Sequence, residues 1–352
     1  MKKSVIILFL FILISCKEEK KYNTGHFIES VQNFEAVNTR FDDYNSTAPF
    51  IMHNYLLHFS SNRNSLGADF DIVGENMYME WSKIDATLDI GTNRYDDRFA
   101  YLKPMFDSVN TSCNELGPFS LGYRKEISNS EIIWTDLMMY ASDCSGNYDI
   151  KFIYSELHNN SVSSSYEIKP VQNIGFLNSA QNDLYPTFFG QDLYNYDLWG
   201  TDVSDIEKIL FCSDRDGVYN LYEVNLPADS NLIRSLQSTN PVSIKKLSIN
   251  SANDDKCPFV NGKLMVFTSN REGGYGGFDL YYSVYENGTW SAPVNFGEDI
   301  NTEYDEYRPI TLYYYDFDNN LMIFSSNRPG GKGGFDLYYV GINQMIKKQT
   351  VN

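Results

Sequence analysis

The chain has 352 residues, a formal net charge of −18 at neutral pH and an aromatic content of 15%. This acidity, with no cluster of lysine or arginine beyond the N-terminal segment, argues against nucleic acid as a partner, because phosphates need a basic surface. The four histidines are scattered and no Cys-x-x-Cys spacing occurs, so we expect no metal site. No phosphate loop or nucleophile elbow is present, and no cofactor is expected.

The first residues predict export. Lys2 and Lys3 precede a short apolar run that ends at Ile14, and such a run is too short to span a bilayer but typical of a signal peptide. Residues 13–16, Leu-Ile-Ser-Cys, resemble a bacterial lipobox, which implies removal of residues 1–15 and lipidation of Cys16. Residues 17–20, Lys-Glu-Glu-Lys, resemble the signal that sends lipoproteins of the Bacteroidetes to the outer face of the outer membrane. We therefore expect residues 16–27 to be a lipidated tether, with lipid as the only membrane anchor.

One supersecondary unit recurs along the rest of the chain. Residues 324–340, FSSNRPGGKGGFDLYYV, read as a strand, a glycine-rich turn and a second strand. Four relatives are visible, at residues 59–72, 140–150, 211–224 and 267–283. In the copy at 140–150, Cys144 replaces the arginine. Five copies indicate a repeat architecture.

A second motif precedes each hairpin. An Asn-Thr-like pair leads to two polar or acidic residues and then to a proline, most clearly between Trp290 and Pro309. Its relatives are expected to end at Pro49, Pro104, Pro186 and Pro258. The closing acids of the last four copies are Asp97, Asp183, Asp255 and Glu306, and Asp43 closes the first. These carboxylates should ring one mouth of a channel, where they either form a cation or ligand site or, as we favour, cap the turn amides of their own unit.

The units predict an all-β fold, a β-propeller of four-stranded blades over residues 28–345. The last hairpin leaves no room for an outer strand, whereas the N-terminal segment supplies a spare one, so we expect the N-terminal strand to join the C-terminal blade and close the ring. Five blades are preferred, with six as the alternative. Two insertions, at about residues 107–131 and 190–205, interrupt the early units.

These motifs resemble the WD40-like repeats of the TolB-type β-propeller family over about residues 28–340, most closely in the last two units. The resemblance implies a binding or scaffolding propeller of the cell envelope. Family members usually have six blades, and a count of five departs from that pattern.

The repeated charged residues of the hairpins are interpreted as structural pins. Each arginine is separated from an aspartate by a glycine-containing turn, which would place the two side by side across the hairpin. The residues concerned are Arg63, Asp71, Arg215, Arg271, Asp279, Arg328 and Asp336.

Four cysteines remain after Cys16, an even number in an exported chain. The pairings Cys113–Cys144 and Cys212–Cys257 are preferred among three connectivities, and free buried thiols are the alternative.

Function is expected in what the repeat does not explain. Tyr194, Tyr196 and Trp199, in the second insertion, could stack on sugar rings or fill a protein pocket. No catalytic residue stands out, since Glu115 and Asp197 are the best non-repeated acids. We therefore expect an envelope binding or scaffolding module for a protein or glycan and not an enzyme. The alternative is a carbohydrate-active enzyme with acids in the central channel.

Overall fold

The structure is a computed structural model that describes residues 21–50, 52–93, 99–128, 131–160, 164–193, 202–227, 229 and 231–346. The predicted signal peptide and Cys16 lie outside the described residues, as do Asp97, Tyr194, Tyr196 and Trp199. No helix among the described residues is long and apolar enough to cross a membrane.

The strands form five antiparallel sheets, each of which is one propeller blade. From the innermost strand outward, the first blade contains β2 (Asp43–Thr47), β3 (Asn54–Ser61), β4 (Asp71–Ser82) and β5 (Thr87–Thr92). The second contains β6 (Glu115–Ser128), β7 (Glu131–Ser142), β8 (Asp149–Asn160) and β10 (Gln172–Asn173), with β9 (Ser164–Ile168) also on β8. The third contains β11 (Asp183–Phe189), β12 (Lys208–Ser213), β13 (Asn220–Asn225) and β14 (Ile244–Lys246).

The fourth blade contains β15 (Asp255–Asn261), β16 (Leu264–Ser269), β17 (Asp279–Glu286) and β18 (Thr289–Trp290), with β19 (Val294–Asn295) also on β17. The fifth contains β20 (Glu306–Leu312), β21 (Asn320–Ser326), β22 (Asp336–Ile342) and β1 (Gln32–Asn33). Short helices η1 (Ala100–Leu102), α1 (Lys103–Val109), η2 (Val203–Asp205) and α2 (Leu232–Leu236) lie in the connections. In most blades, the innermost strand and the strand next to it are buried along nearly their whole length, as expected for sheets covered on both faces.

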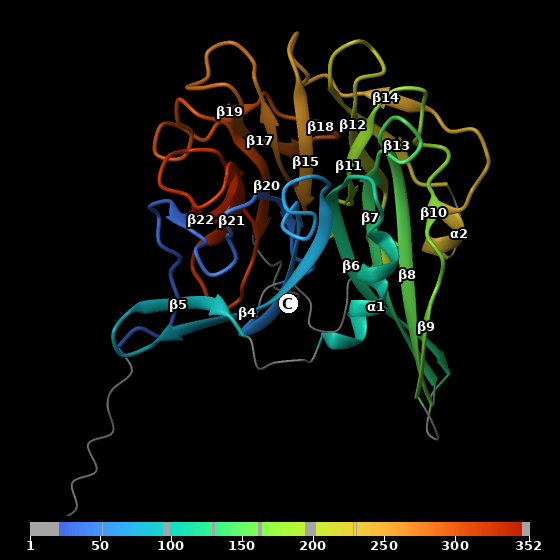
Figure 1. Ribbon diagram of the computed structural model, residues 1–352, viewed down its shortest axis with the longest axis horizontal. Helices are drawn as coiled ribbons and strands as arrows, with labels where there is room; N and C mark the ends of the chain where they lie inside the picture. Colours follow the sequence, from blue (N-terminus) through green and yellow to red (C-terminus); the bar gives the residue numbers. More distant parts are fainter. Residues whose placement is uncertain are drawn as a thin grey trace, which may run out of the picture.

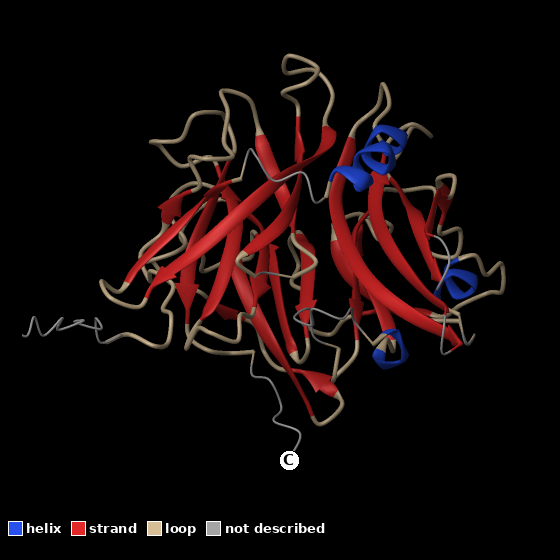
Figure 2. Ribbon diagram, turned by 90° about the horizontal axis from the view of Figure 1, so that it is seen from below, coloured by secondary structure: helices blue, strands red, loops and turns tan. Residues whose placement is uncertain are grey.

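The blades close into a ring. Innermost strands contact one another in the order β2, β6, β11, β15, β20 and back to β2. The N-terminal strand β1 pairs with β22 in the C-terminal blade, with Gln32 opposite Tyr339 and Asn33 opposite Tyr338. Both the five-blade count and the closure by the N-terminal strand are therefore confirmed, and the alternative of six blades is wrong. Figures 1 and 2 show the blades side by side around a common centre.

In the second blade, the inner strand begins later in the chain than predicted. Pro104 belongs to α1 and does not lead an inner strand. The inner strand is β6, which begins at Glu115 and carries Pro118 where the later blades carry Pro186, Pro258 and Pro309. The predicted insertion at 107–131 is thus largely the strand itself. The polar motif that ends at Pro104 matches the repeat by chance. Only the strand pairing shows that the inner strand of this blade begins at Glu115.

Candidate functional site

The inner-strand acids are part of a repeated clasp. Asp43, Glu115, Asp183, Asp255 and Glu306 are all fully buried at the start of their strands. Each accepts a backbone N–H from the residue four positions earlier, as Ser251 donates to Asp255 over 2.5 Å. The carboxylates therefore cap turns of their own motif, and their side chains are closed to solvent. Glu115 is the second blade's member of this set, whereas the sequence suggests Asp97, which lies outside the described residues.

Four arginines complete the clasp, but with a different partner from the one predicted. Arg271 Nη2 lies 2.5 Å from Asp255, and Arg63, Arg215 and Arg328 make the same contact with Asp43, Asp183 and Glu306 over 2.5–2.9 Å. The preceding serine, such as Ser269 at 2.9 Å from Arg271 Nε, orients each guanidinium toward the inner strand. The expected pairing across the turn is wrong.

The hairpin aspartates have a separate task. Asp279 accepts the N–H groups of Tyr275 and Gly276, and Asp336 accepts those of Lys332 and Gly333. Asp71 accepts a hydrogen bond from Asn64 in the first blade. The arginines thus bind the acids of the inner strands, and the aspartates bind groups of their own hairpin turns.

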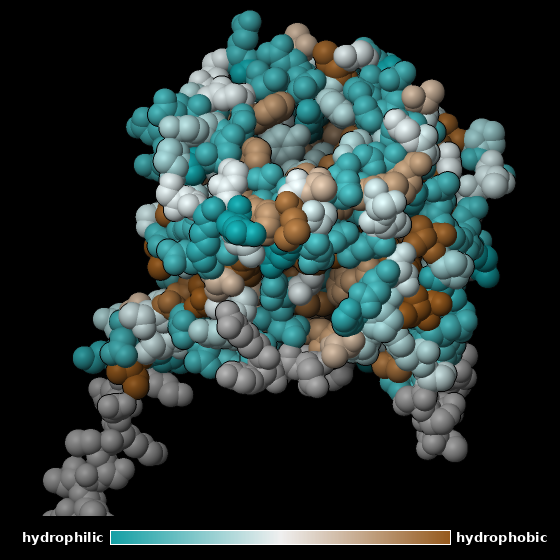
Figure 3. All heavy atoms as spheres, in the orientation of Figure 1, coloured by the Kyte–Doolittle hydropathy of each residue, from teal (hydrophilic) through white to brown (hydrophobic). Residues whose placement is uncertain are grey.

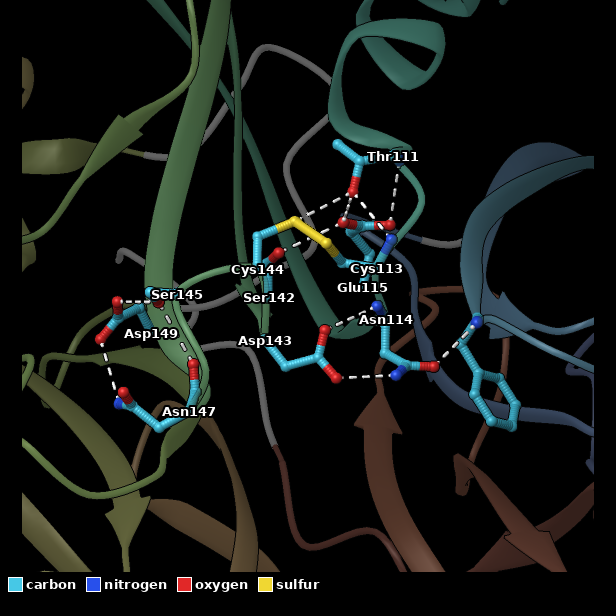
Figure 4. Close-up of a disulfide and its surroundings, with 11 residues drawn as sticks. Thr111, Cys113, Asn114, Glu115, Ser142, Asp143, Cys144, Ser145, Asn147 and Asp149 are labelled. Atoms are coloured by element: carbon cyan, nitrogen blue, oxygen red, sulfur yellow. Dashed lines mark hydrogen bonds between the residues drawn. A yellow bond between two sulfur atoms is a disulfide. The ribbon is translucent and has the colours of Figure 1, made fainter.

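A disulfide occupies the clasp of the second blade. Cys113 and Cys144 are bonded, with Cα atoms 5.4 Å apart, beside Glu115 and Thr111 (Figure 4). Cys144 stands at the arginine position, so a covalent link replaces the ion pair of the other four blades. Burial raises the pKa of Glu115, while its hydrogen bonds from Thr111 and Ser142 oppose this rise.

The second predicted disulfide is wrong. Cys212 and Cys257 are free and buried, and burial raises the pKa of both thiols. Their places in the repeat explain this arrangement. Cys212 stands where other blades carry Ser60, Thr268 or Ser325, whose hydroxyls accept the N–H of Gly117, Arg308 and Asn45 in the next blade. The Cys257 N–H reaches the Cys212 sulfur in the same way.

Side chains fill the propeller axis at this level. The residue two positions after each clasp acid has a positive φ of 48–59°, and these residues are Asn45, Gly117, Tyr185, Cys257 and Arg308. The conformation is costly for residues other than glycine, so the surrounding bulge must impose it. These are the positions at which the blades differ in sequence. The structure thus places the repeat-breaking residues on the axis as well as in the insertions.

Tyr185 and Arg308 form the axial plug. Arg308 is fully buried, donates to the carbonyls of Pro118 and Pro258 over 3.1 Å, and lies 5.3 Å from the centre of the Tyr185 ring. A Cβ added at Gly117 would lie 2.2 Å from the Tyr185 ring, so glycine makes room for the tyrosine. Buried side chains therefore occupy the axis at this level.

A cavity lined by aromatic and polar side chains lies between the first and second blades. Its volume is about 160 Å³, and its walls come from β3, β6, β7 and the η1–α1 segment. Helix α1 bridges the two blades by contacting β4 and β8 (Figure 1). The walls are mainly apolar or aromatic, and the polar lining residues are His58, Ser120, Tyr101, Trp134 and Asp136.

His58 is buried in this cavity as a neutral imidazole. Only 2% of the residue is exposed, and burial lowers its pKa to about 3. Its Nδ1 lies 2.6 Å from Ser120 Oγ, whereas Nε2 is buried without a hydrogen-bond partner. A base this weak is a poor activator of Ser120, so the chemistry of the pair does not favour a nucleophile–base dyad.

Asp136 is the one carboxylate among the described lining residues. The Trp134 indole donates to Oδ1 over 3.1 Å, and Oδ2 is buried without a partner. Burial raises the pKa of Asp136 to about 6, while hydrogen bonds from the side chains of Trp134 and Tyr101 oppose this rise. Opposite Asp136 on β6 is Gly122, where a Cβ would lie 3.1 Å from the indole. Glycine therefore allows Trp134 to lie against β6.

Sequence reasoning missed this cavity. Its polar residues come from four separate segments, and no local motif links His58 to Asp136. One usable signal existed, since Trp134 and Asp136 alternate onto one face of a strand that begins earlier than its counterparts in the other units. Among the described residues, no group of three metal-ligating side chains could hold a metal ion.

No family model matches the chain, and no curated protein matches it in sequence. Solved structures similar to it include a GH62 hydrolase in complex with xylotriose, at 8% identity and a TM-score of 0.46, covering 92% of this chain and 97% of that one. A putative glycoside hydrolase from Bacteroides ovatus aligns at 9% identity and a TM-score of 0.43, over 92% and 98%. An exo-β-1,3-galactanase from Clostridium thermocellum aligns at 12% and 0.43, over 91% and 64%.

These similarities correct one expectation. The prediction that the chain is not an enzyme is not kept, since the solved structures named above bear the names of glycoside hydrolases and likenesses of this size show neither an activity nor its absence. The alignments concern the fold, and at these identities they transfer neither a substrate nor a catalytic residue to this chain. The TolB-type relationship remains a resemblance of motifs.

Proposed function

We propose that this protein is a carbohydrate-binding propeller whose inter-blade cavity receives one sugar ring. The observation that carries the proposal is a cavity with aromatic walls whose lining residues include His58 and Asp136, each of which has a buried polar atom without a hydrogen-bond partner, Nε2 of His58 and Oδ2 of Asp136. An apolar cavity of about 150 Å³ holds one benzene ring, so a volume of about 160 Å³ limits the ligand to one sugar ring, whose hydroxyl groups make it larger than benzene. Aromatic faces stack on the apolar face of a sugar, while the polar atoms bond its hydroxyls.

Unpaired polar atoms favour a ligand over an empty cavity. A buried polar group without a hydrogen bond costs about 1–3 kcal/mol, and a hydroxyl-bearing ligand removes that cost at both atoms. Tyr101, which is 39% exposed, lies at the edge through which a ligand can enter.

The test is titration calorimetry of the soluble propeller, residues 21–352, with a panel of monosaccharides and short oligosaccharides. We expect saturable binding that Trp134→Ala weakens at least tenfold. Trp81→Ala, in β4, is the matched control and should bind as wild type does. No binding by any sugar, from a folded protein, would refute the proposal.

Hydrolysis is the second candidate function, and the raised pKa of Asp136 favours it, because a carboxyl with a pKa of about 6 can act as a general acid near neutral pH. Glycoside hydrolysis ordinarily needs a second carboxylate about 5–9.5 Å away, and the described lining residues include none besides Asp136. Release of nitrophenol from aryl glycosides, lost in Asp136→Asn, would favour the enzyme over the binding protein.

We also propose that lipidation of Cys16 anchors the propeller to the outer membrane. The support is the sequence of residues 13–20 alone. Metabolic labelling with a radioactive fatty acid should tag the wild-type protein and not Cys16→Ala, and protease treatment of intact cells should degrade the propeller if it faces outward.

A further inference from the structure

The inter-blade cavity has an unbalanced charge. Asp136 is the only acid among its described lining residues, and no lysine or arginine is among them. His58 does not act as the counter-charge, because burial keeps its imidazole neutral at physiological pH. The Trp134 indole and the neighbouring Tyr101 hydroxyl offer dipoles to the carboxylate but no positive charge.

Aromatic side chains surround this carboxylate. Phe50, Phe99, Tyr101 and Trp134 line the same cavity as Asp136. Aromatic faces attract cations through the ring quadrupole, and cages of this kind recognise ammonium groups. An anionic ligand would meet both the carboxylate and the negative faces of the rings. A metal ion would find too few ligands, since the described residues hold no group of three.

We propose that the ligand is an amino sugar with a free ammonium group, which pairs with the Asp136 carboxylate while the ring stacks on Trp134. The inference rests on the proposed carbohydrate-binding function and names its ligand class. Nε2 of His58, on the β3 side of the cavity, then bonds a ring hydroxyl. An N-acetylated sugar lacks the positive charge and is larger, so it fits less well.

The experiment compares glucosamine, glucose and N-acetylglucosamine by calorimetry at pH 7 and low salt. We expect glucosamine to bind at least tenfold more tightly than glucose. Asp136→Asn, which keeps the size of the side chain, should abolish this preference and leave glucose binding in place. Asp89→Asn removes an exposed carboxylate of β5 and is the matched control; it should leave the preference unchanged.

A pH series adds a second readout. The titratable groups near Asp136 are His58, Tyr101 and Tyr166, and none of them gains or loses a proton between pH 5 and 7. Affinity for glucosamine should therefore rise over this range as Asp136 ionises, whereas affinity for glucose should change little.

The outcomes separate the two proposals. If glucose and glucosamine bind equally, the amino-sugar inference is wrong and the carbohydrate site stands. If Asp136→Asn retains the preference for glucosamine, the ammonium group binds elsewhere and the inference is also wrong. If none of the sugars binds, both proposals fail. Circular dichroism of each variant confirms that it is folded.

Discussion

Replacing Cys113 and Cys144 by serine tests the interpretation of the second blade most directly. The bond closes a loop with a sequence separation of 31 residues. In the chain-entropy model such a loop contributes about 3–4 kcal/mol to the free energy of unfolding. At about 2 °C per kcal/mol for a domain of this size, the melting temperature should fall by about 6–8 °C.

A repair variant sharpens this test. Cys113→Ser combined with Cys144→Arg would give the second blade the arginine that the other four blades have, next to the buried Glu115. A charge-assisted hydrogen bond contributes about 1.5–3 kcal/mol. The repaired protein should therefore regain about 1–2 kcal/mol over the double serine variant.

The assay is guanidinium unfolding followed by tryptophan fluorescence, under oxidising conditions. Cys212→Ser is the control, because serine or threonine occupies this position in three other blades, and it should change stability by less than about 1 kcal/mol. A loss below about 1 kcal/mol in the double serine variant would refute the entropic argument. Equal stability of the serine and arginine variants would refute the equivalence of Cys144 with the arginines.

Three further predictions concern the clasp, the cavity and the ring closure. Arg271→Ala leaves the buried Asp255 without its cation and should cost about 2–4 kcal/mol, whereas Arg234→Ala, which removes the 61%-exposed partner of Asp229, should cost less than about 1 kcal/mol; equal losses would contradict the clasp. The folded-state pKa of Asp136, about 6, lies above its ordinary value of 3.8, so this group lowers stability as pH rises from about 4 to 6. Asp136→Asn should then be more stable than wild type at pH 7 by up to about 3 kcal/mol and lose this advantage near pH 4 in urea titrations; an advantage that does not vary with pH would argue against a buried, ionised carboxylate. Deleting residues 28–41 removes β1 from β22 and should lower the melting temperature clearly in calorimetry, and an unchanged transition would mean that the ring does not depend on this strand.

The distribution of apolar residues on the surface indicates where a ligand can bind. In the view of Figure 3, hydrophilic residues dominate and the apolar ones are scattered, with no single broad apolar face. Small recessed sites therefore matter more for recognition on this side than a wide hydrophobic patch.

The sequence by itself determined the repeat, the five blades and the closure by an N-terminal strand. These features are local, since a glycine-rich turn and its flanking strands are encoded within about 17 residues, and counting the copies at each end reveals the missing strand. The Cys113–Cys144 disulfide could also be predicted from the sequence, because both residues fall within one unit.

Only the tertiary structure decided which side chains meet, both within a blade and between blades. The arginines pair with an acid of the inner strand because the preceding serine orients them there, and Glu115 joins that set although its sequence neighbourhood matches poorly. Cys212 and Cys257 lie next to each other as thiols in a ring of interblade contacts, an arrangement that no spacing indicates. His58 and Asp136 share a cavity only because the first two blades pack side by side. Contacts between units depend on how the blades are arranged around the axis, and a repeat seen in sequence carries no information on the side chains at its seams.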